Sequence, residues 1–484
     1  MPEWLAHPWS LVLACNYLLA VLAVLTILRR PRDPTAMLSW IFAVLLLPFI
    51  GLFVYWLFGE NHVVQRAGKR RRRIIRRLTR MGRWDPDAPF RGVVAAHEAR
   101  DQELLEVEQL TERVGGGPAI GGNQVLAFEE SQQTYAAIEQ AIRAARHHVH
   151  MTYYIWQPDE TGRFFRDLLI EKAQTGVECR VLLDSVGSFK LGKRFLQPLH
   201  DAGVEVAFYL PLFPFRKNWS LHLRNHRKIV VVDGDLGFTG SQNIGDEYRG
   251  RLKKLSPWYD SHLQIRGPAV GLLQQVFAED WLLATGRTIK DPAYFRVPPA
   301  AGETVMQIVP SGPDRDVNSL IHILYAMVSR ARRSVRVATP YFCPDPLIQT
   351  ALLHAAYRGA RVQLLLPTRS DAPLILWAGR SFYKELIEAG IEVYENDKGV
   401  LHSKVITVDD RWALVGSANM DIRSFRLNFE ITAMLYDADV TAQLVATIER
   451  RVAESRRLMA NDVNRGGAVR EVLQGAARLF APLL

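Results

Sequence analysis

The stretch Leu223–Asn243 reads LRNHRKIVVVDGDLGFTGSQN, and Leu401–Asn419 repeats its polar residues as LHSKVITVDDRWALVGSAN. Each copy is a His-x-Lys-x4-Asp pattern followed by Gly-Ser-x-Asn, with identical intervals. The shared residues are His226, Lys228, Asp233, Gly240, Ser241 and Asn243 in the first copy, and His402, Lys404, Asp409, Gly416, Ser417 and Asn419 in the second. Packing requires apolar periodicity rather than matched polar side chains, so the repeat indicates a duplicated chemical site.

Each copy also predicts its own local structure. An apolar run follows each histidine, then a turn signal at Asp233 or Asp409, then a second apolar run, which is typical of a buried β-hairpin. Side chains at i and i+2 of a strand share a face, so each histidine is expected beside its lysine. The glycine, hydroxyl and amide of Gly-Ser-x-Asn suit phosphate oxygens. The pattern therefore predicts a site for a phosphoryl group.

These residues resemble the phospholipase D superfamily, whose double His-x-Lys-x4-Asp signature the chain reproduces in full. The chain is similar in particular to bacterial cardiolipin synthases, over nearly its whole length. Besides the two motifs, the resemblance is carried by RNHRK at 224–228, WYD at 258–260, PSGPD at 310–314, TPYF at 339–342 and GSANMDIRSFRLNFE at 416–430.

The resemblance implies a mechanism with two histidines. One histidine attacks phosphorus to give a phosphohistidine, and the other protonates the leaving alcohol and then activates the acceptor. By the family's usual assignment His226 is the nucleophile and His402 the acid and base, although the near-symmetry of the sequence leaves this open. Lys228 and Lys404 are expected to neutralise the phosphate charge.

The resemblance also implies roles for the remaining motif residues. The expected phosphate-binding donors are Ser241, Asn243, Ser417 and Asn419. Asp260 and Glu430 are expected to orient the histidines from behind and fix their tautomers. The aspartates Asp233 and Asp409 belong to the catalytic motif but look structural in the family, where they sit in the hairpin turn. No metal and no cofactor is expected, because lysines already neutralise charge.

The acceptor decides the function. For cardiolipin synthesis, one phosphatidylglycerol donates its phosphatidyl group, glycerol leaves, and a second phosphatidylglycerol accepts the group. With water or another alcohol as acceptor, the chain is instead a membrane-bound phospholipase D or another transphosphatidylase. A superfamily nuclease would not need the N-terminal apolar segments, and a non-catalytic scaffold would not keep both His-Lys pairs. Whether phosphatidylethanolamine can replace the second lipid stays open, as does the oligomeric state.

Composition limits the classes of binding partner. The chain has 484 residues and a formal net charge of +10, which attracts anionic partners, either nucleic acid or an acidic lipid surface. The expected partners are phosphatidylglycerol and anionic membrane lipid, with no nucleic acid. Cys15, Cys179 and Cys343 are widely spaced, which predicts neither a disulfide framework nor a zinc site.

The N-terminus predicts a membrane anchor. Pro8–Leu28 is an apolar run of spanning length, and basic residues follow it instead of a signal-peptide cleavage site. A second run, Ala36–Phe58, is broken by Pro48 and Gly51, so it either spans or forms a kinked or re-entrant hairpin.

A basic cluster follows at 66–80 and predicts a cytoplasmic catalytic region in a multi-pass protein of the bacterial inner membrane. It can also hold anionic headgroups or simply form a solvated helix face. The loop with Arg29, Arg30 and Arg32 is basic as well, which conflicts with two full spans and favours a re-entrant second segment.

The rest of the chain falls into two similar halves of alternating helices and strands. The expected elements of the first half are helix Tyr135–Ala145, strand Val149–Trp156, helix Phe164–Thr175 and strand Val177–Leu183. The corresponding elements of the second half are Ile321–Arg332, Ser334–Phe342, Pro346–Tyr357 and Arg361–Pro367, in the same order. The predicted fold class is α/β, with two phospholipase D-like α-β-α halves packed as a pseudo-twofold pair behind two N-terminal membrane helices. The expected division is 1–60 for the anchor, 61–122 for a basic and linker helical region, 123–300 for the first half, 301–445 for the second half and 446–484 for a C-terminal helical tail.

Two further segments have open interpretations. The first half contains an extra aromatic and proline-rich loop at 211–219, which forms either a lip for acyl chains or a buried loop. The tail Ala468–Leu484 is amphipathic and either touches the membrane surface or docks on the globular body.

Overall fold

The computed structural model describes residues 8–29, 34–56, 102–211, 220, 222–252, 256–315, 317–370, 372–464 and 467–479. The predicted basic cluster at 66–80, nearly all of the aromatic loop at 211–219 and the last residues of the tail, 480–484, lie outside the described residues.

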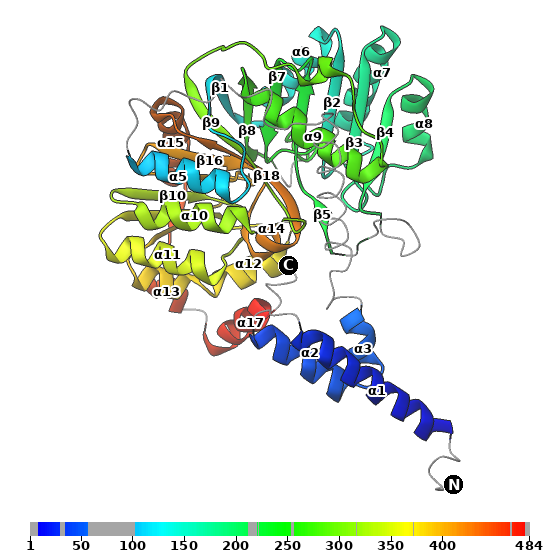
Figure 1. The fold of residues 1–484 in the computed structure, drawn as a ribbon. Coiled ribbons are helices and arrows are strands. Elements are labelled where there is room, and N and C mark those ends of the chain that lie inside the picture. The colour runs from blue at the N-terminus through cyan, green and yellow to red at the C-terminus, as the bar shows by residue number, and fades with distance from the viewer. Residues whose placement is uncertain are drawn as a thin grey trace.

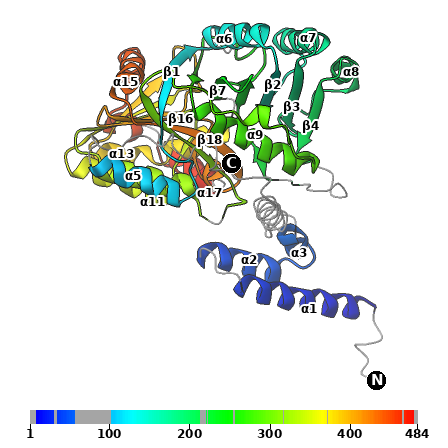
Figure 2. The same cartoon turned by 45° about the horizontal axis from the view of Figure 1, so that its top comes forward.

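The N-terminal region forms a helical group that lies apart from the α/β body in both views (Figures 1 and 2). It contains α1 (Pro8–Leu28), α2 (Pro34–Leu46) and α3 (Ile50–Val54). The Asn16 side chain accepts a hydrogen bond from the Phe49 amide at 2.9 Å, which ties the turn between α2 and α3 to α1. Apolar side chains such as Leu18 and Phe42 are exposed, so this group does not bury them against the body.

Within the part of the chain that the structure describes, one helix is long and apolar enough to cross a membrane. It is Trp9–Leu28, with a mean hydropathy of 2.6. The second apolar run does not form a second helix of that length, because the chain turns at Pro48 and divides the run into α2 and α3. Of the two predicted membrane helices, the described residues thus show one helix of spanning length, and the second apolar run is a broken segment.

The first half is built on a mixed sheet. Its strands are, in spatial order, β4 (Glu205–Tyr209), β3 (Glu178–Asp184), β2 (His148–Tyr153), β6 (Ile229–Val232), β7 (Leu236–Gly240), β8 (Trp258–Arg266) and β1 (Ile120–Glu130). The first three strands are parallel and need crossover helices, whereas the hairpin β6–β7 brings in the motif. The helices α6 (Ser131–Ala144), α7 (Glu160–Gln174) and α8 (Lys193–Asp201) line one face, and α9 (Ala269–Thr285) packs on the other (Figure 2).

The second half repeats this order of strands. They are β13 (Glu392–Asn396), β12 (Arg361–Pro367), β10 (Ser334–Ala338), β15 (Val405–Val408), β16 (Trp412–Gly416), β18 (Asn428–Leu435) and β9 (Thr304–Ser311). The covering helices are α10 (Ser319–Arg330), α11 (Pro346–Tyr357) and α13 (Tyr383–Glu388) on one face, with α15 (Ala438–Ala453) on the other. The helix α12 (Pro373–Arg380) packs against the short strand β11 (Phe342–Cys343). The matched order confirms the predicted mixed α/β fold and its duplication.

The two sheets are joined rather than merely adjacent. Strand β1 pairs with β8 in the first sheet and with β9 in the second, so it belongs to both. A shared core lies at this junction, where Leu263 and Ile265 of β8 are buried in one cluster with Ile431 and Ala433 of β18. Because both strands also carry polar residues of the site, this core fixes the distance between the two halves.

Most predicted elements agree with the structure, and two strands are shorter than expected. The strand predicted at Ser334–Phe342 ends at Ala338, before Pro340, which has no N–H for a ladder hydrogen bond. The strand predicted at Val149–Trp156 ends at Tyr153, and the Ile155 amide donates to the side chain of Asn243 at 3.2 Å. At the C-terminus, α17 (Gly467–Leu479) packs on α12, so the described part of the tail docks on the body while Val469 and Val472 stay exposed.

Candidate active site

Each histidine is positioned by a short strand that crosses to the other half. Strand β5 (Arg224–Asn225) pairs in parallel with the start of β18, and the His226 amide donates to the carbonyl oxygen of Phe429 at 2.9 Å. Strand β14 (Val400–Leu401) pairs in the same way with the start of β8, and the His402 amide donates to the carbonyl oxygen of Tyr259 at 2.7 Å. Both motifs are therefore held at the boundary between the halves.

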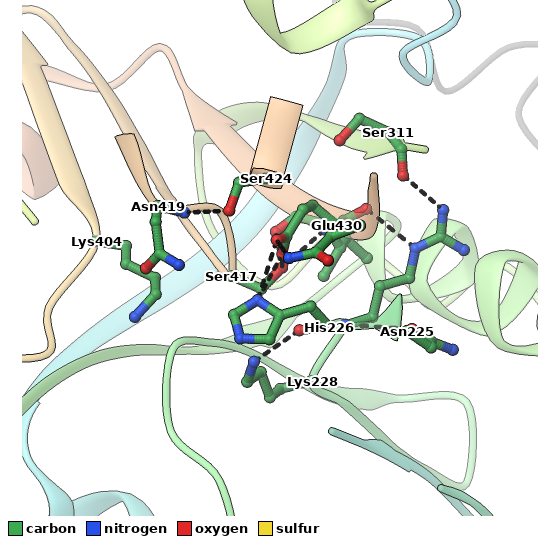
Figure 3. A network of polar contacts seen from close by, with 12 residues as sticks. Asn225, His226, Lys228, Ser311, Lys404, Ser417, Asn419, Ser424 and Glu430 are labelled. Atoms are coloured by element: carbon green, nitrogen blue, oxygen red, sulfur yellow. Dashed lines mark hydrogen bonds and ion pairs between the residues drawn. The ribbon is translucent and has the colours of Figure 1, made fainter. Parts of the chain in front are cut away.

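The orienting carboxylates also come from the opposite half. Glu430 on β18 lies against His226, with its Oε2 atom 2.9 Å from Nδ1. Asp260 on β8 lies against His402, with its Oδ1 atom 2.7 Å from Nδ1. Each carboxylate accepts from Nδ1–H and leaves Nε2 as the nitrogen available for chemistry. Figure 3 shows Glu430 at His226, with Lys228 below the ring and Lys404 and Asn419 across from it.

The motif serines support these carboxylates and do not point toward a substrate. The Ser241 hydroxyl donates to Asp260, and the Ser417 hydroxyl donates to Glu430. Both side chains are fully buried. The expected role of Ser241 and Ser417 as phosphate donors is therefore corrected, because their single hydroxyl protons are already directed to the carboxylates.

The glycines of the two Gly-Ser-x-Asn sequences allow the neighbouring strands to approach closely. A Cβ on Gly240 would lie 2.3 Å from the carbonyl oxygen of Ser261, and one on Gly416 would lie 2.4 Å from that of Ile431. The close approach expected at these glycines is thus to the neighbouring strand, which lets β8 and β18 bring the carboxylates in.

The two lysines are buried beside their histidines. Lys228 Nζ donates to the carbonyl oxygen of His226 at 2.7 Å, and Lys404 Nζ donates to that of His402 at 2.9 Å. Lys404 Nζ also lies 3.2 Å from Nε2 of His402. Burial lowers the pKa of Lys228, while the nearby Glu430 carboxylate acts in the opposite direction. The expected pairing of histidine and lysine on one face is confirmed in both copies.

Both histidines face one cavity of about 300 Å³. The described residues that line it are Tyr154, Ile155, Arg224, His226, Asn243, Tyr248, Trp258, Tyr341, Ile375, His402, Asn419, Asp421, Arg423 and Asn428. The predicted amides Asn243 and Asn419 are therefore at the cavity wall, where they can meet a substrate. The Asn419 Oδ1 atom is buried without a hydrogen-bond partner in the described part of the protein. A bound substrate could supply that partner.

Burial sets the protonation state of the first histidine. It lowers the pKa of His226 to about 4, with Glu430 opposing this and Lys228 adding to it. Burial acts to raise the pKa of Glu430, but the His226 contact and Lys228 outweigh it, so the net shift is downward. The same balance, with His402 and Lys404 in place of His226 and Lys228, lowers the pKa of Asp260. At neutral pH His226 is therefore a neutral imidazole beside an ionised carboxylate.

The motif aspartates lie in the hairpin turns and away from the cavity wall. Asp233 accepts hydrogen bonds from the backbone amides of residues 146, 147 and 148, all at 2.8–2.9 Å. Asp409 accepts in the same way from residues 332, 333 and 334, at 2.7–2.8 Å. The grouping of Asp233 and Asp409 with the catalytic residues is thus corrected, since each carboxylate clamps the start of a neighbouring strand.

Sequence reasoning missed several residues of the cavity wall. Arg224 and Arg423 lie within the quoted motif stretches but were given no role there. Asp421, which lies with Arg423 in the segment 416–430, lines the cavity, and burial raises its pKa to about 6. A signal was present, because none of these three residues has a like residue at the matching position of the other copy: Val400, Glu247 and Gly245 stand there.

In the part of the chain that the structure covers, no group of three or more His, Cys, Asp or Glu side chains is arranged to hold a metal ion.

Comparison with known families matches both halves of the chain. A family described as "Cardiolipin synthase, PLD-like domain" matches residues 138–281 and 324–452, and one described as "Phospholipase_D-nuclease N-terminal" matches residues 18–60.

Individual relatives match almost the entire length. The chain is 39% identical over 458 residues to "Cardiolipin synthase 2" of Bacillus anthracis, covering 94% of this chain and 88% of the relative. It is 37% identical over 478 residues to "Cardiolipin synthase" of Geobacillus sp. (strain WCH70), covering 98% of this chain and 93% of the relative. Among solved structures, the phosphatidylserine synthase of Haemophilus influenzae Rd KW20 has a similar fold, with a TM-score of 0.60 and 17% identity over 79% of this chain and 100% of that one.

Proposed function

The chain belongs to the bacterial cardiolipin synthases of the phospholipase D superfamily, and from that membership we propose that it joins two phosphatidylglycerol molecules into cardiolipin and glycerol. The proposal rests on one observation above the others. Two histidines face a single cavity, and each is hydrogen-bonded to a carboxylate from the opposite half. A pair of imidazoles so oriented can divide nucleophilic attack and proton transfer between them.

In the first proposed step His226 Nε2 attacks phosphorus of the donor lipid. The pKa of about 4 keeps this imidazole neutral, so its lone pair is available. His402 donates a proton to the glycerol oxygen as the bond between phosphorus and that oxygen breaks. The product of this step is a phosphatidyl group bound to His226 and a free glycerol molecule.

In the second proposed step the proton moves in the opposite direction, from the acceptor lipid to His402. His402 takes the proton of the acceptor hydroxyl, the hydroxyl oxygen bonds to phosphorus, and the bond to His226 breaks. Lys228 and Lys404 supply positive charge to the phosphate in both steps, and Asn243 and Asn419 donate hydrogen bonds to it from the cavity wall. The carboxylates of Glu430 and Asp260 keep each imidazole in the required tautomer.

The membrane setting fits this reaction, since both substrates are lipids. The chain is associated with the membrane through its N-terminal region, where α1 has the length and composition of a span. We propose further that the protein is a multi-pass protein of the bacterial inner membrane, that its catalytic region is cytoplasmic, and that nucleic acid is not a substrate. The divisions 1–60, 61–122, 123–300, 301–445 and 446–484 are kept as the proposed domain boundaries.

The test is product analysis with the full-length protein in phosphatidylglycerol vesicles, following cardiolipin, glycerol and phosphatidic acid together. Equal amounts of cardiolipin and glycerol are expected, and both products are expected to disappear in His226→Ala and His402→Ala. Phosphatidic acid without cardiolipin would mean that water is the acceptor, and the chain would then be a phospholipase.

A further inference from the structure

The two sides of the catalytic cavity differ in chemistry. Near His402 the wall is aromatic, with the ring of Trp258 centred 5.2 Å and that of Tyr248 6.3 Å from the imidazole. On the side of His226 the wall carries the guanidinium groups of Arg224 and Arg423. Aromatic rings thus lie beside both histidines, since the ring of Tyr154 is centred 4.9 Å from that of His226, whereas the two arginines of the wall have no counterparts beside His402.

The two arginines come from different halves but reach the same wall. Arg224 begins β5, two residues before His226, and is 4% exposed. Arg423 lies on α14 (Ile422–Arg426), and its Nη2 atom donates to the carbonyl oxygen of His222 at 2.9 Å, in the segment that leads into β5. This hydrogen bond brings α14 against the chain that carries Arg224, so both guanidinium groups lie next to the cavity at one place.

The charges at this wall act on one another. Burial lowers the pKa of Arg224, with Asp184 opposing this and the positive charge of Arg423 adding to it. Both arginines also lower the pKa of Tyr154, whose ring is centred 4.9 Å from that of His226, although burial raises that pKa overall. Two like charges brought together at a buried wall repel, and an anion between them would relieve the repulsion.

The duplicated chemistry does not require these arginines. In the other copy Val400 stands at the position of Arg224, and Glu247 stands at the same offset from the motif asparagine as Arg423. The residues that the transfer needs from both halves are all duplicated, whereas the arginine pair is present once. A pair that is present once matches a feature of the substrates that is itself present on one side of the reaction.

The phosphate in transfer already has Lys228 and Lys404 beside the histidines. Asp421, the acidic residue of this wall, directs its carboxylate to the Ser424 amide at 2.6 Å as the cap of α14. Asp184 also lies near Arg224, but it does not line the cavity, and its carboxylate accepts hydrogen bonds from the backbone amides of residues 186, 187 and 225. Among the lining residues, one carboxylate therefore faces two guanidinium groups, which makes this part of the wall attractive to a second anion.

We propose that Arg224 and Arg423 form a subsite for the phosphodiester of the acceptor lipid, which stays intact while the phosphatidyl group of the donor is transferred. The proposal rests on the function proposed above. In the transfer step the acceptor hydroxyl oxygen bonds to the donor phosphorus, the bond from phosphorus to His226 breaks, and the proton goes to His402. The acceptor's own phosphodiester undergoes no change, and the planar forks of the guanidinium groups hold its two charged oxygens. The enzyme thereby selects an anionic acceptor over a neutral alcohol.

The test compares two acceptors in one preparation. Full-length protein in phosphatidylglycerol vesicles is supplied with labelled glycerol. Cardiolipin then reports transfer to the anionic lipid, and labelled phosphatidylglycerol reports transfer to neutral glycerol through the same phosphohistidine. We expect Arg224→Gln and Arg423→Gln to lower the ratio of cardiolipin to labelled phosphatidylglycerol about tenfold or more. Arg423→Lys should restore part of the ratio, because it keeps the charge without the fork.

The matched control is Arg426→Gln. This arginine lies on the same helix, does not line the cavity, and is an exposed side chain that forms an ion pair with Asp345 at 2.8 Å, so its loss should leave the ratio unchanged. Labelled phosphatidylglycerol that still forms in the Arg224 and Arg423 variants shows that these variants are folded and that both histidines remain active. Equal loss of both products, or an unchanged ratio, would overturn the subsite. Wild-type protein that forms phosphatidic acid and neither transfer product would instead overturn the proposed function itself.

Discussion

The two motif copies match in sequence, yet the surroundings of their histidines are built differently. Behind His226, the Arg227 side chain fills the space and donates to the carbonyl oxygens of Glu430 at 3.0 Å and Ser311 at 3.1 Å, and to Asp280 at 2.6 Å. The matching position behind His402 is Ser403, and there a cavity of about 50 Å³ remains, lined in part by Asp260. The same chemical groups are thus set in a rigid, charged frame on one side and in a looser one on the other.

This difference suggests how a duplicated site can acquire two roles. A nucleophile must return to the same place and stay neutral, which a filled frame and a low pKa favour for His226. A proton carrier must change its charge twice in each cycle, which a less constrained setting tolerates better. The comparison therefore agrees with His226 as nucleophile and His402 as acid and base, and the following changes should break or sharpen it.

The largest effect is expected from the carboxylates that both copies share. Glu430→Gln and Asp260→Asn keep the size of each side chain but can present an amide N–H to Nδ1, which favours the wrong tautomer. Each should lower kcat/KM for cardiolipin formation about 10²–10⁴-fold, as measured in phosphatidylglycerol vesicles. Glu129→Gln, at a carboxylate ion-paired with Arg451 outside the catalytic cavity, is the control. A normal rate in either Glu430→Gln or Asp260→Asn would show that the two copies do not orient their histidines alike.

The next largest effect is a difference in stability loss between matching substitutions in the two copies. Arg227→Met leaves the buried carboxylate of Asp280 without its ion-pair partner, and should cost about 3–5 kcal/mol. Ser403→Ala, at the matching position, removes one hydrogen bond of 3.3 Å to the Tyr259 carbonyl and should cost less than about 1 kcal/mol. Thermal unfolding followed by tryptophan fluorescence measures both. Similar losses in the two variants would mean that the frames are equivalent.

A pH-dependent effect is expected at Asp421, whose counterpart in the first copy is Gly245. Burial raises its folded pKa to about 6 from an ordinary value of 3.8, so the folded state binds the proton more tightly than the unfolded state. The stability present below about pH 4 is lost as the pH rises through about 6, by about 3 kcal/mol. Asp421→Asn lacks this loss, so its unfolding temperature relative to wild type should rise between pH 4 and 7. A constant difference across this range would contradict the assignment.

The smallest effect is expected where the copies are most alike. Asp233→Asn and Asp409→Asn each retain a side chain that tolerates the positive φ of about 54° and 53° at these turns, but lose one charged acceptor for three backbone amides. Each should lower stability by about 1 kcal/mol and leave turnover per folded molecule unchanged. A large fall in turnover without a fall in stability would return these aspartates to the catalytic group.

Sequence reasoning predicted the duplicated fold because hydrophobic periodicity and turn residues are local signals. It also predicted the histidines, the lysines and the orienting carboxylates Asp260 and Glu430, although the last two came from resemblance. It assigned Ser241 and Ser417 to the phosphate, since a sequence does not say which of two acceptors a buried hydroxyl meets. That answer depends on the pairing of β7 with β8 and of β16 with β18, which places each serine beside the carboxylate of the neighbouring strand.

The remaining differences have the same origin. Spacing within a motif does not reveal that Asp233 and Asp409 lie at the far end of the hairpin from the cavity, against the start of another strand. The arginine pair, Arg224 and Arg423, comes from segments that are distant in sequence and meet through the His222 carbonyl. Pro48 predicts a break in the second apolar run, but the sequence alone does not distinguish a kinked span from two short helices. The structure shows that the chain turns there and forms α2 and α3.

The most direct test of the divided roles uses a donor lipid whose leaving group is p-nitrophenol, which needs no proton from an acid. With His402→Asn, we expect a burst of about one p-nitrophenolate per enzyme, because attack by the nucleophile proceeds while release to the acceptor is blocked. Mass spectrometry of the trapped protein should then locate the phosphatidyl group on His226, and His226→Asn should give no burst. A burst in His226→Asn with the group on His402, or turnover without any covalent intermediate, would contradict the account.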